Sequence, residues 1–159
     1  MARMQGTFLL RNWLPVVVWI GIIVLESTDM MSAQHTGSWL YAICHAVFGS
    51  VNRAQFEIFH HVLRKLGHFV GYGTLAVLSF RAFRATFSNV YARSSGYARL
   101  WGSALLLTCS VASLDEWHQS FIPSRTASVR DVALDTLGGV ALLLIAMLWM
   151  RRKRPVAAA

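Results

Sequence analysis

The sequence has few charged residues, and acidic ones are the scarcest. Only seven of its 159 residues are Asp or Glu and only 14% are charged, whereas 55% are hydrophobic. This balance is too apolar for an ordinary soluble domain of this length and indicates a membrane protein. The 15 Lys and Arg residues give a formal net charge of +8, but most of them flank apolar segments instead of gathering on one face between aromatic residues. This pattern argues against a nucleic-acid partner.

Cysteines and metal-ligand motifs are also scarce. The two cysteines, Cys44 and Cys109, suggest neither a disulfide framework nor a zinc knuckle. A zinc site would need His68, His118 and a carboxylate, and no HExxH or CxxC spacing supports one. The serines near these histidines lack the nucleophile elbow of a catalytic triad. We therefore expect no metal and no cofactor.

Four apolar segments predict an all-α, membrane-embedded four-helix bundle. A helix needs about 20 residues to span a bilayer, and the segments reach this length when their polar ends are included. The predicted spans cover residues 10–30, 62–83, 98–119 and 130–150 of a single domain over residues 1–159. Residues 38–49 and 54–63 look helical but are too short to cross, so we expect a short helical segment in the membrane interface between the first two spans. A signal peptide is the alternative for the first segment, but its cleavage site is poor.

The charged residues separate between the two ends of these predicted helices. Four spans place both termini on one side, together with the loop between the second and third spans and the basic tail at residues 151–159. Ten of the 15 basic residues lie there: Arg3, Arg11, Arg81, Arg84, Arg93, Arg99, Arg151, Arg152, Lys153 and Arg154. The positive-inside rule makes this side cytoplasmic. All seven acidic residues and all six histidines fall on the outer half, so we expect the chemistry at the outer face.

Polar residues gather at the outer helix ends, most densely in residues 110–139. Lys65, His68 and Tyr72 form one helical stripe at i, i+3 and i+7, whereas Asp115 and Glu116 diverge by about 100° around their helix. The candidate catalytic residues are Lys65, His68, Asp115, Glu116, Gln119, Arg125 and Asp131. The candidate substrate-binding residues are Glu26, Tyr72, His118, Arg130 and Asp135. Two glycine pairs, Gly67 with Gly71 and Gly138 with Gly139, are positions where another helix could approach closely.

This chemistry suits an anionic ligand, with alternatives left open. Lys65, Arg125 and Arg130 would hold a phosphate or carboxylate, and His68 or Glu116 would act as general acid or base. The residues that would orient them are Asp115, Gln119 and Asp131. Alternatively, opposite charges close to hydrocarbon only pair to dock the helices, as in a structural or interaction protein. A proton-coupled transporter is a third hypothesis, but the inner halves of the third and fourth helices lack the polar path that it needs.

The motifs that carry this cluster resemble those of one family. They are Lys65-x-x-His68, Tyr72, the pattern DExxQ-x3-P-x-R-x5-D from Asp115 to Asp131, and the pair Gly138-Gly139. Together they resemble the VanZ-like family of bacterial membrane proteins, over roughly residues 13–150. Asp135, where the family usually has Asn, and Arg64, where it often has an acid, depart from the pattern.

The resemblance implies a role at the cell envelope of a bacterium, in the cytoplasmic (inner) membrane. The family's named member is associated with low-level resistance to the glycopeptide teicoplanin, which acts at the outer surface on peptidoglycan precursors. We therefore expect membrane lipids and a lipid-linked cell-wall precursor as partners, with a homodimer left open. The resemblance supplies no settled reaction, so whether the protein is an enzyme stays open. The alternative is a structural or interaction protein that scaffolds cell-envelope machinery.

Overall fold

The computed structural model describes residues 2–87 and 94–152. In these two stretches the chain forms five α-helices and one short 3-10 helix, and it has no strand. In order they are α1 (Ala2–Glu26), η1 (Asp29–Met31), α2 (Ala33–Phe48), α3 (Arg53–Phe87), α4 (Ser94–Gln119) and α5 (Val129–Arg152). The predicted all-α class is therefore confirmed.

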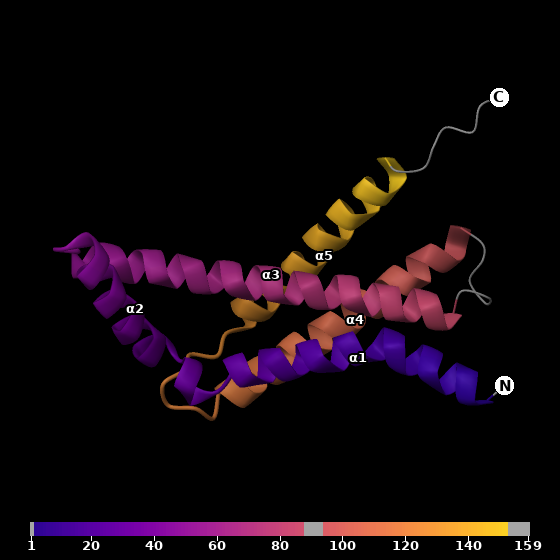
Figure 1. The fold of residues 1–159 in the computed structure, drawn as a ribbon, viewed down its shortest axis with the longest axis horizontal. Coiled ribbons are helices and arrows are strands. Elements are labelled where there is room, and N and C mark those ends of the chain that lie inside the picture. Colours follow the sequence, from indigo (N-terminus) through magenta and orange to yellow (C-terminus); the bar gives the residue numbers. More distant parts are fainter. Residues whose placement is uncertain (1, 88–93, 153–159) are drawn as a thin grey trace.

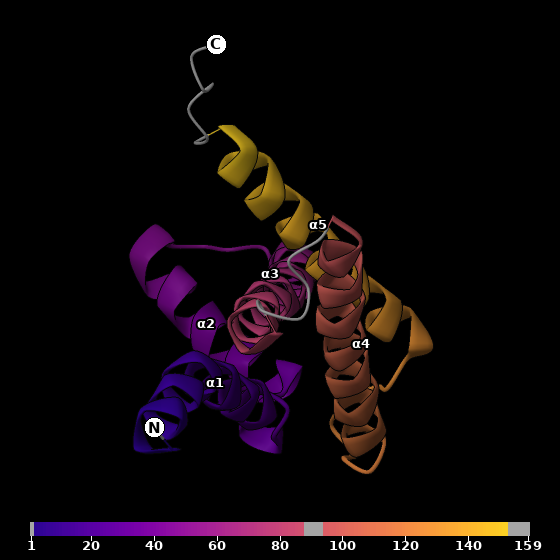
Figure 2. The same ribbon diagram turned by 90° about the vertical axis from the view of Figure 1, so that its right-hand side faces the viewer.

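Helix α3, at 35 residues, is the axis of the molecule. It contacts α1, α2, α4 and α5, and Figure 2, which looks along α3, shows these four helices placed around it. The helix starts cleanly because the side-chain oxygen of Asn52 accepts hydrogen bonds from the backbone N–H groups of Ala54 and Gln55, at 3.0 and 3.3 Å. This is an N-cap, which satisfies donors that a helix start would otherwise leave unpaired.

The predicted short segment at residues 54–63 is not a separate element. Residues 54–63 and the predicted span 62–83 form one continuous helix, since α3 begins at Arg53. The other predicted short segment, residues 38–49, lies largely in α2, a separate helix that folds back beside the first part of α3 (Figure 1). A tight turn joins the two helices, with Gly49 at a φ of 79°, a conformation that glycine adopts without steric cost.

Helices α3 and α5 cross at very close range. A Cβ atom on Gly138 would lie 2.2 Å from the backbone oxygen of Phe69, and one on Gly73 would lie 2.9 Å from the backbone oxygen of Gly138. Gly138 was predicted to be such a contact, and the structure confirms it. The spacing of Gly67 and Gly71 also permits such a contact, but the structure does not use it, because a Cβ atom on either would have no other atom within 4 Å.

The helix ends that carry the acidic residues come together. Figure 1 shows the end of α1, the start of α3, the end of α4 and the start of α5 at the side of the molecule where α2 lies. Neighbouring helices along the chain therefore run in alternating directions, apart from the short α2. This arrangement assembles the polar residues from four helices at one end.

One helix in the described part of the chain, Val129–Met150 within α5, is long and apolar enough to cross a membrane, with a mean hydropathy of 2.1. Helices α1, α3 and α4, with 25, 35 and 26 residues, are also long enough to cross a membrane, by length alone. The four-span topology and the cytoplasmic position of the termini stay predictions.

Candidate functional site

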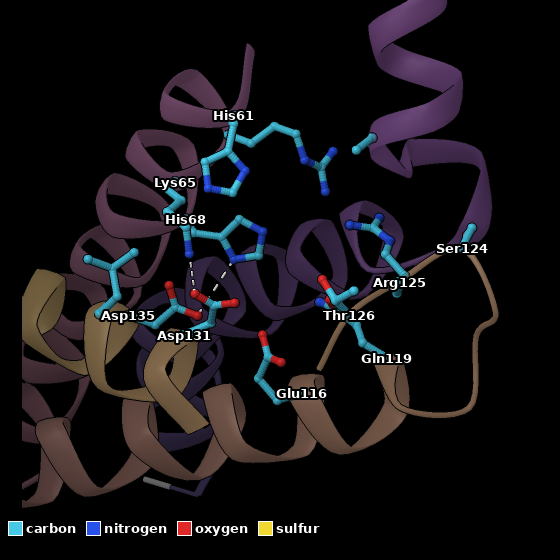
Figure 3. A pocket seen from close by; sticks show the side chains of 13 residues that line it. His61, Lys65, His68, Glu116, Gln119, Ser124, Arg125, Thr126, Asp131 and Asp135 are labelled. Atoms are coloured by element: carbon cyan, nitrogen blue, oxygen red, sulfur yellow. Dashed lines mark hydrogen bonds and ion pairs between the residues drawn. The ribbon is translucent and has the colours of Figure 1, made fainter. Parts of the chain in front are cut away.

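A cavity of about 130 Å³ lies between the first half of α3, the end of α4, the loop that follows it and the start of α5 (Figure 3). We call it the polar cavity. Seven of the predicted site residues line it: Lys65, His68, Glu116, Gln119, Arg125, Asp131 and Asp135. The structure thus brings together side chains that are up to 70 residues apart in the sequence, while their roles stay predictions.

Two ion pairs join α3 to α5 in the wall of this cavity. Lys65 pairs with Asp131, and His68 Nδ1 lies 3.6 Å from Asp135 Oδ2; Figure 3 marks both contacts. The Asp135 side chain is completely buried, and among the described residues its oxygens accept no hydrogen bond. His68 is therefore the nearest group that can compensate this carboxylate, and the pair depends on the close crossing of α3 and α5 at Gly138.

The two neighbouring carboxylates of α4 face different surroundings, as their angular separation predicts. Glu116 lines the polar cavity and accepts a hydrogen bond from the backbone N–H of Ser128 at 2.7 Å. Asp115 is buried behind the cavity, where it accepts hydrogen bonds from the Tyr72 hydroxyl and the Gln119 amide, both at 2.9 Å. Glu116 can therefore reach a ligand, whereas Asp115 fixes Tyr72 and Gln119 in place.

Two arginines line the polar cavity without a carboxylate partner. Arg64 donates to the backbone oxygen of Met31 at 2.8 Å, and Arg125 donates to the backbone oxygens of Glu26 and Thr28. Neither side chain takes part in an ion pair in the portion of the chain that the structure describes. Their two positive charges repel each other across the cavity.

Arg125 is the less well satisfied of the two. Its Nε atom is buried and has no hydrogen-bond partner among the described residues. Burial lowers the pKa of this guanidinium, and the nearby carboxylates of Asp115 and Asp29 oppose the effect. Because a guanidinium binds phosphate or carboxylate with paired hydrogen bonds, two desolvated arginines in one cavity form a place where an anion would be stabilised.

The remaining predicted residues lie elsewhere. Tyr72 and Asp115 belong to the buried network behind the cavity. Glu26 lines a neighbouring cavity. His118 Nδ1 lies 3.1 Å from the hydroxyl of Ser27, which directly follows α1. Arg130 is exposed and does not line the polar cavity. The structure therefore does not bring His118 and Arg130 to the site.

The sequence analysis missed four polar residues of the cavity wall, which are His61, Arg64, Ser124 and Thr126. His61 continues the stripe of Lys65 and His68 one turn toward the helix start, so extending the helical period would have found it. No comparable signal marks Arg64. Its importance comes from η1 and α2, whose backbone and side chains hold its guanidinium.

The described residues contain no group of three His, Cys, Asp or Glu side chains placed to hold a metal ion. The polar cavity is lined by guanidinium, ammonium, imidazole, carboxylate, amide and hydroxyl groups. These can bind an anion and move protons.

The fold and the site define an all-α protein with an apolar helix of membrane-spanning length and a charged cavity at the joined helix ends. The model of the family described as VanZ/LLP1 matches residues 12–150, and the chain belongs to this family. The resemblance seen in the sequence motifs is thereby confirmed. No curated protein and no solved structure matches the chain.

Proposed function

We propose that this VanZ/LLP1 family member is a multi-pass protein of the bacterial cytoplasmic membrane that binds an anionic envelope lipid or lipid-linked cell-wall precursor at the outer face. The observation that carries the proposal is the pair of arginines in the polar cavity, Arg64 and Arg125, which have backbone partners but no carboxylate partner. An anionic headgroup between them would supply the missing negative charge.

The membrane part of the proposal rests on exposed apolar side chains. Val17 on α1, Leu106 on α4 and Ile145 on α5 are 63%, 70% and 63% exposed, and many other large apolar residues of these helices are exposed as well. A soluble protein rarely exposes so much apolar surface, whereas lipid covers it without cost. The orientation rests on the positive-inside rule, since the polar cavity lies at the end opposite to Arg84 in the last turn of α3 and Arg99 near the start of α4.

A chemical step on the bound lipid would use the residues beside the arginines. His68, held by Asp135, and Glu116 both line the cavity, so either can donate or accept a proton there. Binding or modification of a precursor at the outer surface would change the target on which a glycopeptide antibiotic acts. A role in resistance to teicoplanin is therefore part of this proposal.

Lipid binding by variants of the two arginines tests the proposal. Native mass spectrometry or a titration in detergent would compare the wild-type protein with Arg64→Gln and Arg125→Gln, using phosphatidic acid and a polyprenyl pyrophosphate as probes. A hydrogen bond to a charged group contributes about 1.5–3 kcal/mol, so each variant should bind about tenfold more weakly or worse. The control is Arg81→Gln, because Arg81 is exposed on α3, the helix that carries Arg64, but lies far from the polar cavity. Equal binding by all four proteins would exclude the arginine pair as the anion site.

Labelling in intact cells tests the outer face. A cysteine at Ala127 lies in the exposed loop between α4 and α5, and Cys44 and Cys109 would be replaced by serine. A thiol reagent that does not cross membranes should label this cysteine before lysis. Labelling only after lysis would place the loop in the cytoplasm and remove the outer-face proposal.

A further inference from the structure

A second cavity of about 290 Å³ adjoins the polar cavity, between α2, the first half of α3 and the end of α1. We call it the apolar cavity. Its carbon-rich walls come from Met31, Trp39, Leu40 and Leu63. Two polar residues of its wall can hydrogen-bond to each other, since Thr36 Oγ1 lies 3.3 Å from His60 Nε2.

The two cavities share two residues, Arg64 and His68. The guanidinium of Arg64 and the imidazole of His68 therefore line both cavities. The polar cavity alone is smaller than the roughly 300–1,000 Å³ typical of small-molecule sites, but the two volumes taken together fall within that range. A ligand that fills both would have a charged end and an apolar end.

We propose that the two cavities are the two halves of one site for a lipid with a phosphate headgroup. The phosphate lies in the polar cavity between Arg64 and Arg125, and a hydrocarbon chain enters the apolar cavity between α2 and α3. This inference rests on the proposed anion-binding function and adds to it the location of the chain. In this arrangement Arg64 marks the junction, where the headgroup ends and the hydrocarbon begins.

The rim of the apolar cavity fits an entry from the lipid phase. Trp39 and Leu63 are 69% and 45% exposed although both line the cavity, so the cavity opens beside apolar surface that a bilayer would cover. Tryptophan is common at the level of lipid headgroups. A hydrocarbon chain could then leave the bilayer and enter the protein without contacting water, which is the condition for a favourable transfer.

Gly67 leaves the floor of the apolar cavity open. A Cβ atom on Gly67 would have no other atom within 4 Å, although the residue lies on α3 and lines the cavity. No neighbouring helix uses the space that the missing side chain leaves, so a ligand can occupy it. A leucine there would occupy part of the apolar cavity, whereas Arg125 lines only the polar cavity.

The test compares a long and a short lipid with the same headgroup. The probes are dioleoyl phosphatidic acid and the water-soluble dibutyryl phosphatidic acid, and the variant is Gly67→Leu. The matched control is Gly102→Leu, because a Cβ atom on Gly102 also has nothing within 4 Å and Gly102 lines neither cavity. Because each buried methylene adds to affinity, wild-type protein should bind the long lipid more tightly. Gly67→Leu should bind the long lipid about tenfold more weakly and the short lipid within about twofold of wild type.

Different failures have different meanings. Full binding of the long lipid by Gly67→Leu, combined with its loss in Arg125→Gln, would keep the phosphate site and overturn the chain location. No binding of either lipid by wild-type protein would overturn the proposed function itself. If Gly67→Leu unfolds, Leu40→Trp fills the cavity from α2 instead, and the same selective loss of the long lipid is expected.

Discussion

The crossing of α3 and α5 at Gly138 can be tested by adding a single methyl group. In Gly138→Ala the new Cβ atom would lie 2.2 Å from the backbone oxygen of Phe69 and 3.1 Å from its Cα atom. These are backbone atoms of a long helix, so they cannot rotate away, and the two helices must separate. Overpacking of this kind costs about 1–3 kcal/mol, and a backbone contact should lie near the upper end. Alanine regains about 1 kcal/mol of helix propensity over glycine, so the net loss should be about 2 kcal/mol.

Thermal unfolding in detergent measures this loss. A change of 1 kcal/mol shifts the midpoint by about 2–4 °C in a chain of this size, so Gly138→Ala should unfold about 4–8 °C below wild type. The controls are Gly71→Ala and Gly102→Ala, where the new methyl group meets no atom within 4 Å and the midpoint should stay or rise. The site should also respond, because separating the helices moves Asp135 away from His68. An unchanged midpoint with unchanged lipid binding in Gly138→Ala would refute the close crossing.

Two further substitutions test the buried polar groups by thermal unfolding. His68→Ala leaves the fully buried Asp135 without its partner, which should cost about 3–5 kcal/mol of folding free energy. The control His45→Ala, at an exposed position of α2, should change the midpoint little. Equal midpoints for His68→Ala and wild type would show that the pair does not stabilise the fold. Tyr72→Phe removes the hydroxyl that donates to buried Asp115 at 2.9 Å and should cost about 1–3 kcal/mol, so a variant as stable as wild type would mean that this hydrogen bond is not made.

Much of the arrangement could be predicted from the sequence because it follows from helix geometry and charge. Asp115 and Glu116 had to diverge, since adjacent helical residues point about 100° apart, and the structure gives them separate partners. The pairing of opposite charges near hydrocarbon was expected for the same physical reason, and Lys65 pairs with Asp131.

Other features depend on tertiary contacts that no local pattern encodes. The spacing of Gly67 and Gly71 permits a close helix contact but does not say which face meets a partner, and α5 approaches at Gly73 instead. The break expected before the second span is absent because Asn52 caps one long helix that begins at Arg53. Arg64 joined the site only through η1 and α2, which lie about 30 residues before it in the sequence.

The most direct test of the central claim is an experimental structure of the protein in a bilayer disc that contains phosphatidic acid. The account predicts phosphate density within hydrogen-bond distance of both Arg64 and Arg125, with a hydrocarbon chain running over Gly67. A structure in which the two guanidinium groups instead form ion pairs with Glu26 or Asp29, and no lipid lies between them, would contradict it.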